Sequence, residues 1–316
     1  MQAVIIAGGK GTRLRPLTYD CPKPMLPLFD RPFLAWLIER CRQAGIVDIL
    51  LNVHYQAQQV IDYFGTGDRF GVQIRYLQES SPLDTAGAVK LAEPWFTGEP
   101  LLIFNADILT DLDLVKLTEF HHQHQAQVTL ALTPVPDITP FGLVELDQDQ
   151  QVLAFREKPS PDQAAIYLAQ GINTINAGTY VIEPSLFQPY PAGAPLSFER
   201  VFFPEVLAQG AKVFGYVHQG YWLDLGTPHK YWQAHQDILA GLIPYDFAAQ
   251  AHSPGIWLSP SATVDPQAQL HPPCFVGDRV WIGAKAVIPP HTVIRANSVI
   301  DCSLTPGIYA PGSLLV

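Results

Sequence analysis

The sequence contains few cysteines and few charged residues, and it lacks any long hydrophobic run. Its 4 cysteines include no C-x-x-C pair, which disfavours a zinc ribbon or a thioredoxin-type motif. Charged residues make up 15% of the chain, and 29 acids outnumber 19 bases, for a formal net charge of −10. Nucleic-acid binding needs a surplus of basic side chains, so this class is excluded. No apolar stretch reaches the ~20 residues that cross a bilayer.

The composition is that of an ordered globular protein. Hydrophobic residues make up 48% and aromatic residues 11% of the 316 residues, enough for a sizeable core. This length fits one large domain or two, and the 29 prolines indicate many short strands and turns in at least one region. The first two residues lead directly into an apolar segment, without a basic leader. We therefore expect a cytoplasmic protein with reduced thiols and no membrane partner.

Segments of strand and helix character alternate over residues 1–135. Residues 2–7 form an apolar run without polar alternation, typical of a strand buried on both faces of a parallel sheet. A helical segment follows Pro32 and closes at Gly45, and further strand and helix pairs come after it. This alternation predicts an open α/β sheet with helices on both faces. Residues 140–240 alternate irregularly, and we expect their strands to join the same sheet.

The last sixty residues carry a six-residue repeat. An aliphatic residue recurs at every sixth position: Leu258, Val264, Leu270, Val276, Ile282, Ile288, Ile294 and Ile300. This period predicts a parallel β-helix with triangular coils, one hexapeptide to a side and the aliphatic side chain inside. Pro306 and Gly312 interrupt the repeat, so we expect the solenoid to stop near residue 301. A β-rich tail with chance spacing is the alternative.

A glycine-rich loop, AGGKGTRL (7–14), follows the first strand. Glycines let backbone N–H groups approach an anion closely. Residues 8–27 hold four basic side chains and one acid, a positive island in an acidic chain. The loop fits neither the Walker A pattern nor G-x-G-x-x-G, because position 14 is Leu. We predict a phosphate-binding loop, and an ordinary glycine turn with exposed bases is the alternative.

Two further motifs bring charge to the same region. In PKPMLP (22–27), two prolines stiffen the backbone around Lys23, which would aim its ammonium group at a phosphate. FNAD (104–107) places Asp107 at the end of a buried strand, where the carboxyl ends of parallel strands bind ligands. Its carboxylate there can hold Mg²⁺, or it can cap a helix.

Three later motifs carry groups suited to a sugar and to a metal. In FREKP (155–159), Glu157 and Lys158 can enter one site only if the strand ends there, and Pro159 ends it. NAG (176–178) offers Asn176 to sugar hydroxyls. WLDLGTP (222–228) offers Asp224 as a second oxygen ligand for a metal.

These motifs, in this order, resemble those of the sugar-1-phosphate nucleotidyltransferases, also called nucleoside-diphosphate-sugar pyrophosphorylases. GGKGTRLRPLT, PKPMLPL, FNAD, FREKP, NAG and WLDLGTP carry the resemblance, which covers essentially the whole chain. The C-terminal hexapeptides are similar to those of the mannose-1-phosphate guanylyltransferase branch. The resemblance implies a Rossmann-like open mixed sheet followed by a short left-handed parallel β-helix. The expected domains are a catalytic domain (1–240), a linker (241–256) and the β-helix (257–316).

The resemblance also implies the reaction and its residues. An NTP and a sugar 1-phosphate, at best GTP and mannose 1-phosphate, would give an NDP-sugar and pyrophosphate with Mg²⁺ as cofactor. The implied catalytic residues are Arg13, Lys23 and Asp107, and the Mg²⁺ ligands are Asp107 and Asp224. The implied nucleotide-binding residues are Ala7, Gly8, Gly9, Gly11, Thr12, Glu79, Thr85, Ala86 and Gly87. The implied residues for the sugar and its phosphate are Gly142, Glu157, Lys158 and Asn176.

The base-reading segment YLQESSPLDTAG (76–87) leaves the nucleotide open. Glu79 can accept hydrogen bonds from guanine. Asp84 stands where guanylyltransferase-like members commonly have glycine, and it restricts the backbone. Glucose-1-phosphate thymidylyl- or uridylyltransferase activity is therefore an alternative, as is a non-catalytic regulatory homologue that binds a nucleotide sugar. Acyl transfer by the solenoid is disfavoured because the coil is short.

The β-helix segment is expected to mediate assembly. Residues 246–316 contain only four acids and three bases, and Phe275 and Trp281 are expected to point outward. In a monomer they would form an exposed apolar patch, so we expect a homo-oligomer through this domain. Elsewhere, His121, His122 and His124 lie near the end of a predicted helix, where cations complement the helix dipole; metal binding is the alternative.

Overall fold

The computed structural model describes residues 1–79, 81–247 and 249–316. Ser80, within the base-reading segment, therefore lies outside the described residues. The chain forms two units. The first comprises Met1–Thr12, Thr18–Pro24 and Leu34–Trp222, and the second comprises Arg13–Leu17, Met25–Phe33 and Leu223–Val316. The predicted domain boundaries at 240 and 257 stay a prediction.

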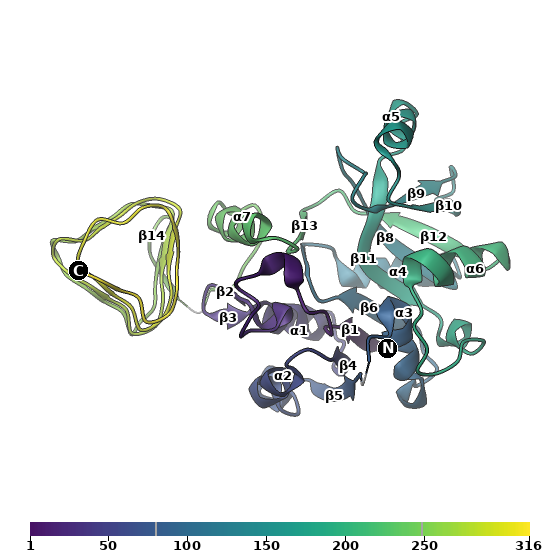
Figure 1. Ribbon diagram of the computed structural model, residues 1–316, viewed down its shortest axis with the longest axis horizontal. Coiled ribbons are helices and arrows are strands. Elements are labelled where there is room, and N and C mark those ends of the chain that lie inside the picture. The colour runs from purple at the N-terminus through teal and green to yellow at the C-terminus, as the bar shows by residue number, and fades with distance from the viewer. Residues whose placement is uncertain (80, 248) are drawn as a thin grey trace. The chain divides into compact units, whose positions relative to one another are not determined.

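A nine-stranded mixed sheet forms the centre of the first unit (Figure 1). Its strands are β1 (Gln2–Ile6), β4 (Asp48–Val53), β5 (Gln73–Gln78), β6 (Leu101–Asn105), β8 (Val128–Pro134), β9 (Gly142–Leu146), β10 (Val152–Glu157), β11 (Thr174–Ile182) and β12 (Val213–Val217). Along the sheet they follow the order β10-β9-β11-β6-β1-β4-β5, and β8 pairs with β11 and β12. The strands β6, β1, β4 and β5 run parallel, whereas β11 is antiparallel to β6. The predicted open α/β sheet is confirmed, and the strands beyond residue 140 join it.

Helices and short strands complete the first unit and begin the second. The helices are α1 (Phe33–Gln43), α2 (Ala57–Phe64), α3 (Asp84–Leu91), α4 (Leu114–Gln123), α5 (Pro161–Ala169), α6 (Phe203–Ala208) and α7 (Pro228–Leu239). Two short strands are β7 (Ile108–Thr110) and β13 (Trp222–Asp224). Local sequence sets the helix starts: Ser160 and Gln163, for example, form a reciprocal capping box at α5. No helix in the described part of the chain is long and apolar enough to cross a membrane.

The strand β1 lies in the middle of the sheet. Ala3, Val4 and Ile5 are completely buried, as expected for a strand covered on both faces. Its two parallel neighbours are β4 and β6, so the carboxyl ends of all three strands meet at one edge. That edge is where ligands bind in open α/β sheets.

The C-terminal part of the second unit is a parallel β-helix, whose triangular coils are seen end-on in Figure 1. Its strands are β14 (Gln250–Ser253), β15 (Ile256–Leu258), β16 (Thr263–Val264), β17 (Gln269–Leu270), β18 (Cys274–Val276), β19 (Trp281–Ile282), β20 (Val287–Ile288), β21 (Thr292–Ile294), β22 (Val299–Ile300), β23 (Gly307–Tyr309) and β24 (Leu314–Leu315). Strand β15 pairs with β18, and β18 with β21, at steps of eighteen residues, which is three hexapeptides to a coil. The aliphatic repeat residues from Val276 to Ile300 are completely buried, so the prediction that they face inward is confirmed.

The expected end of the solenoid near residue 301 is wrong. Strand β23 pairs in parallel with β21, and β24 with β22, each at a step of fifteen residues. The last coil is thus three residues shorter than the others, which takes the sequence out of the hexapeptide repeat. Backbone pairing continues nevertheless, because strand hydrogen bonds do not depend on the number of residues at the corners.

Phe275 does not point into solvent, contrary to the sequence expectation. Its side chain is 1% exposed and packs against Phe29 and Phe247, with ring centroids 4.9 and 5.9 Å away. Phe29 lies between the short strands β2 (Pro27–Leu28) and β3 (Arg31–Pro32), a hairpin within the same unit. Hexapeptide spacing cannot reveal that a distant hairpin covers this face of the coil. Trp281, 42% exposed, does face solvent.

His121, near the end of α4, differs from the predicted cationic helix cap. His121 is 1% exposed, and its Nδ1 lies 2.9 Å from the Thr129 hydroxyl. Burial, with the neighbouring charge of His122, lowers the pKa of His121 to about 4, so the ring is neutral at pH 7. No cluster of three metal-binding side chains occurs within residues 1–79, 81–247 and 249–316.

Candidate active site

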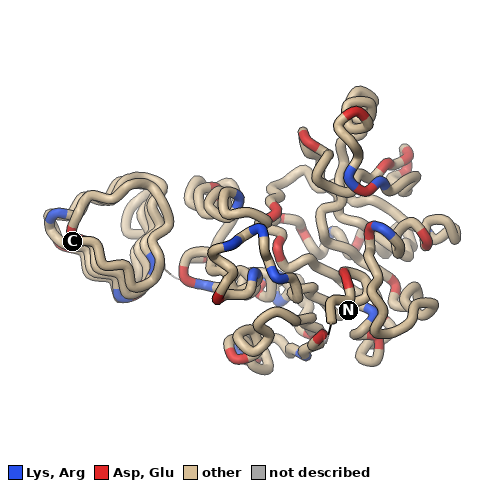
Figure 2. The backbone as a smooth tube through the Cα atoms, in the orientation of Figure 1, with Lys and Arg blue, Asp and Glu red and all other residues tan. Residues whose placement is uncertain are grey.

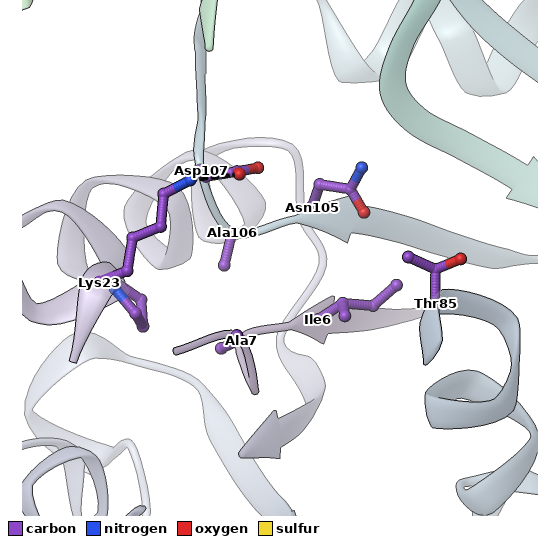
Figure 3. A pocket seen from close by; sticks show the side chains of 9 residues that line it. Ile6, Ala7, Lys23, Thr85, Asn105, Ala106 and Asp107 are labelled. Carbon is purple, nitrogen blue, oxygen red and sulfur yellow. Dashed lines mark hydrogen bonds and ion pairs between the residues drawn. The ribbon is translucent and has the colours of Figure 1, made fainter. Parts of the chain in front are cut away.

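A cavity of about 210 Å³ opens at the carboxyl ends of β1 and β6 (Figure 3). Its walls come from the glycine-rich loop, the 3₁₀ turn Lys23–Met25, the first turn of α3 and the end of β6. The lining residues are Ile6, Ala7, Gly9, Lys23, Pro24, Thr85, Asn105, Ala106 and Asp107. The structure thus brings together the glycine loop, the PKPMLP motif and the FNAD motif, which are far apart in sequence.

The glycine loop is held at both ends within the first unit. The Ala7 N–H donates to Asn52 O at 3.0 Å, and the Thr18 hydroxyl donates to Gly11 O at 2.8 Å. Gly11 has a φ of 60°, and a Cβ there would lie 3.0 Å from Cβ of Lys23. Both the backbone angle and the close approach therefore require glycine at this position. Gly9 and Thr12 are exposed.

Lys23 and Asp107 form an ion pair in the wall of the cavity. Figure 3 shows the Lys23 side chain extended toward Asp107, and the Nζ to Oδ2 distance is 2.5 Å. The lysine side chain is 12% exposed and the carboxylate 29%. Each charge offsets the cost of desolvating the other, so the wall of the cavity can contain both an ammonium group and a carboxylate that are largely buried.

Asn105 and Asn176 share one buried partner, the hydroxyl group of Tyr180. Asn176 Nδ2 donates to that hydroxyl at 2.9 Å, and Asn105 also hydrogen-bonds it. Burial raises the pKa of Tyr180 well above its ordinary value, so the phenol is protonated. Asn176 Oδ1 also accepts from Gly178 N at 3.0 Å. Asn176 thus already makes hydrogen bonds within the protein through both its Nδ2 and its Oδ1. A Cβ on Gly178 would lie only 2.9 Å from Asn105 Nδ2, so a larger residue there would crowd Asn105.

Glu157 and Lys158 lie next to each other at the end of β10. The strand ends at Glu157, and Lys158 adopts a φ of 46°, so the alternation of side chains stops there. Lys158 Nζ lies 3.2 Å from Glu157 Oε1. Gly142 pairs with Glu157 across β9 and β10, and a Cβ at Gly142 would lie 3.1 Å from Glu157 Oε2. A larger residue at position 142 would therefore crowd the Glu157 carboxylate, and glycine avoids this.

The base-reading segment combines buried and exposed groups. Glu79 is 8% exposed, and its Oε2 accepts from Leu83 N at 3.1 Å. Asp84 has a φ of 61°, a conformation that favours glycine, and its carboxylate pairs with Arg200. Asp84 thus adopts the backbone conformation typical of glycine, and its side chain adds an ion pair.

Thr85, Ala86 and Gly87 form the first turn of α3, and they are placed differently. Thr85 lines the cavity, and its hydroxyl accepts from Phe198 N at 2.9 Å. Ala86 is completely buried in the core. A Cβ on Gly87 would lie 2.8 Å from Ala194 O, so this glycine allows close packing. Nucleotide contacts by Ala86 and Gly87 stay a prediction.

Arg13 and Asp224 belong to the second unit. A Cβ at Gly226 would lie 2.9 Å from both Asp224 carboxylate oxygens and 3.2 Å from Arg13 Nη2. Gly226 therefore leaves room for a guanidinium and a carboxylate beside one backbone. Asp224 also pairs with Lys230, at 3.7 Å between Oδ2 and Nζ.

The donor set at Asp107 fits Mg²⁺. This ion takes oxygen ligands, keeps several waters, and is usually bound through one or two carboxylates plus substrate phosphates. The carboxylate of Asp107, 29% exposed in a cavity wall beside the glycine-rich loop, meets that description. A cage of three protein ligands is not needed, so the lack of such a cluster among the residues described is compatible with it.

Sequence reasoning missed three polar residues at the site. Glu199 lies between the Ser197 and Thr85 hydroxyls, 3.1 and 3.4 Å from its Oε2. Burial raises the pKa of Glu199, and the charges of Glu157 and Asp84 add to this. Tyr180 lies within an apolar strand, so the sequence pattern does not mark it as a functional residue. Asn52 could have been noticed, because it is a single amide in the apolar run of β4.

Comparisons with known proteins identify the family of the chain. The nucleotidyl transferase family profile matches residues 2–241. A mannose-1-phosphate guanylyltransferase of Mycobacterium tuberculosis is 37% identical over 95% of this chain and 80% of its own. A UTP–glucose-1-phosphate uridylyltransferase of Synechocystis is 31% identical over 96% of this chain and 82% of its own.

A solved structure is also similar to this chain. HddC of Yersinia pseudotuberculosis, in a complex with GMP-PN, matches with a TM-score of 0.63 and 29% identity, over 75% of this chain and 99% of its own. The residues that the family profile matches include the nine-stranded sheet and the residues that line the cavity. The chain is therefore a member of the nucleotidyl transferase family, among the enzymes that act on sugar 1-phosphates.

Proposed function

We propose that this enzyme transfers a nucleotidyl group from an NTP to a sugar 1-phosphate, with GTP and mannose 1-phosphate as its best substrates. The observation that carries the proposal is the Lys23–Asp107 ion pair in a cavity beside a glycine-rich loop. The names of the relatives from Mycobacterium tuberculosis and Yersinia pseudotuberculosis support a guanine nucleotide. Glu79, an acceptor in the base-reading segment, suits the N1–H and N2–H₂ groups of guanine.

The chemistry needs charge neutralisation more than proton transfer. The attacking oxygen of a sugar 1-phosphate is already ionised, so no general base is required. The reacting α-phosphate gains negative charge in the transition state, and cations placed there in advance lower the barrier. Lys23 fits this role because its ammonium lies in the cavity wall, and the resemblance gives Arg13 the same role toward the triphosphate. Holding both phosphates in line supplies the remainder.

Asp107 would hold Mg²⁺ together with the phosphates, and the resemblance gives Asp224 a corresponding role. When bound, Mg²⁺ supplies a Lewis acid that neutralises phosphate oxygens. The ion pair with Lys23 holds the Asp107 carboxylate in the cavity wall before any ligand arrives. A polyphosphate would also attract the Lys23 ammonium, which leaves the carboxylate available as an oxygen ligand.

The sugar phosphate would bind at the end of β10. Glu157 is a hydrogen-bond acceptor for hydroxyls, and Lys158, 65% exposed, can pair with a phosphate. Gly142 gives the glutamate room, and Asn176 has part of its amide left for a hydroxyl. Glu199 lies close enough to Glu157 to raise its own pKa, which makes it a further candidate neighbour of the sugar.

A substrate screen tests the proposal. Purified protein with Mg²⁺ is assayed for pyrophosphate release with each of the four common NTPs and either mannose or glucose 1-phosphate. We expect the highest kcat/KM with GTP and mannose 1-phosphate. Asp107→Ala should abolish turnover, whereas Asp62→Ala, an exposed aspartate on α2, should retain it. Absence of pyrophosphate with every pair would refute the enzyme assignment.

The same screen separates the alternatives. A preference for UTP or dTTP with glucose 1-phosphate would assign the uridylyl- or thymidylyltransferase activity instead. Binding of a nucleotide sugar without turnover would favour the non-catalytic regulatory homologue. The Synechocystis relative makes the uridylyl alternative the stronger of these.

The same proposal includes a homo-oligomer formed through the β-helix of a cytoplasmic enzyme. Apolar side chains on the coil are exposed: Trp281 at 42%, Leu314 at 68% and Val316 at 80%. Figure 2 shows few charged residues on these coils, which lowers the cost of desolvating them in an interface. Light scattering should give a multiple of the 34.9 kDa chain mass. The substitution Trp281→Glu should lower the mass of the oligomer. A monomeric mass at micromolar concentration would contradict the assembly.

A further inference from the structure

Asn52 is a buried amide for which the described fold provides no partner. It lies on β4 and is 0% exposed, between Ile6 of β1 and Leu77 of β5 in the parallel register. Among the residues described, neither its Oδ1 nor its Nδ2 has a hydrogen-bond partner. A buried amide without partners costs free energy, and an apolar side chain of similar size would avoid that cost. We therefore expect the amide to gain a hydrogen-bond partner in another state of the protein.

The Asn52 side chain faces the glycine loop. A Cβ on Gly8 would lie 3.2 Å from Asn52 Oδ1, which puts the amide against the loop backbone. The main-chain carbonyl of Asn52 already accepts from Ala7 N, at the start of the same loop. Asn52 thus holds the loop through its backbone and presents an unused acceptor one residue further along.

Two polar atoms of neighbouring side chains have partners of their own. The Nδ1 of His54 lies 2.9 Å from Glu79 O, and Glu79 Oε2 accepts from Leu83 N. Since Asn52 is completely buried, a ligand in the cavity cannot touch it directly. It can act only through the backbone that covers it, which is the loop at Gly8 and Gly9.

We propose that Asn52 is a positioning residue for the glycine loop: when a nucleotide draws the loop toward the sheet, Asn52 Oδ1 accepts a backbone N–H of Gly8 or Gly9. This rests on the proposed function, since it needs a nucleotide at the loop. The bond forms only in the nucleotide-bound state. Its formation sets the direction of the remaining loop N–H groups toward the phosphates and adds to nucleotide affinity. It makes no contact with the sugar phosphate.

The test compares three variants of the full chain with GTP and Mg²⁺ as the probe. Asn52→Leu removes the amide at nearly constant size. Asn52→Thr keeps an acceptor in a side chain that strands favour. Thr292→Val is the matched control, because Thr292 Oγ1 is another buried atom without a partner in the described residues, but in the β-helix. Nucleotide Kd, melting temperature without nucleotide, and hydrogen exchange of the peptide 7–14 are measured for each.

We expect Asn52→Leu to raise the Kd for GTP about tenfold, equivalent to about 1.4 kcal/mol, while its melting temperature without nucleotide is unchanged or higher. The threonine variant should fall between the leucine variant and the wild type, and Thr292→Val should bind like the wild type. GTP should protect the loop peptide from exchange in the wild type but much less in the leucine variant. The KM for the sugar 1-phosphate should not change.

A Kd for Asn52→Leu within twofold of the wild type would overturn the inference and would favour a buried water as the partner of the amide. If the leucine variant does not fold, the threonine variant decides: a raised Kd at an unchanged melting temperature supports the role, and an unchanged Kd overturns it. Failure of the wild type to bind any NTP would refute the proposed function itself, which is a distinguishable result.

Discussion

Phe275 offers the sharpest test of how the second unit is built. The sequence pattern places this side chain outward on the β-helix, where it would serve assembly, whereas the structure buries it under Phe29 and Phe247. Truncation by Phe275→Ala therefore removes a side chain that is 1% exposed. Removal of a fully buried phenylalanine typically costs about 3–5 kcal/mol, including the cavity that remains. The two ring contacts favour the upper half of that range.

The assay is urea unfolding followed by circular dichroism, with light scattering under native conditions. We expect the Phe275→Ala midpoint to fall sharply while the native mass is unchanged. The control Leu242→Ala, at a side chain of the second unit that is 61% exposed, should cost about 1 kcal/mol or less. If Phe275→Ala instead costs less than about 1 kcal/mol and lowers the mass, then Phe275 lies at a subunit interface and the described packing is wrong.

Three further predictions concern the site and the pH dependence of stability. Lys23→Met should lower kcat for pyrophosphate release by about 10²–10³-fold, the usual effect of losing one charge-stabilising donor, with the exposed Lys212→Met as control; a loss below threefold would exclude Lys23 from the reaction. Glu157→Gln should raise the KM for the sugar 1-phosphate about tenfold and leave the KM for the NTP unchanged; equal effects on both would place Glu157 elsewhere. His121 has a folded pKa of about 4 against an ordinary 6.5, so the unfolded chain binds more protons between these values. Stability should therefore fall by about 3 kcal/mol as pH drops from 6.5 to 4, and His121→Gln should show a shallower fall in urea titrations at each pH; parallel curves would contradict a neutral buried ring.

The elements of the fold followed from local patterns. The run at β1 has no polar residue to show to solvent, and the hexapeptide aliphatics have only one place to go inside a narrow coil. Both patterns are set by burial, which repeats along the sequence. The motifs of the cavity could also be placed, because the ends of parallel strands share one edge of a sheet.

Other features depend on contacts between distant segments, which periodicity does not encode. The hairpin that covers Phe275 lies more than two hundred residues before it in the chain. The shortened last coil keeps its backbone ladder although the side-chain repeat is lost. Asp84 looked like a departure from glycine that would disturb the backbone, yet its partner Arg200 lies in a segment with no recognisable motif. The position of His121 near a helix end predicts a cation, but packing against Thr129 of β8 buries the ring.

The stacking of the β-helix has a consequence for how this end of the protein loses structure. Each coil pairs only with the coil before it and the coil after it, so its stability is a sum over neighbours along one direction. An aromatic hairpin packs on the coil at Phe275, whereas the coil of β23 and β24 is loosely covered, with Leu314 68% exposed. Opening should therefore start at the C-terminus and travel inward, coil by coil. Amide exchange would then slow progressively from residue 315 back toward residue 274. In the first unit, by contrast, we expect the sheet to open as a whole, so that its amides exchange at similar rates.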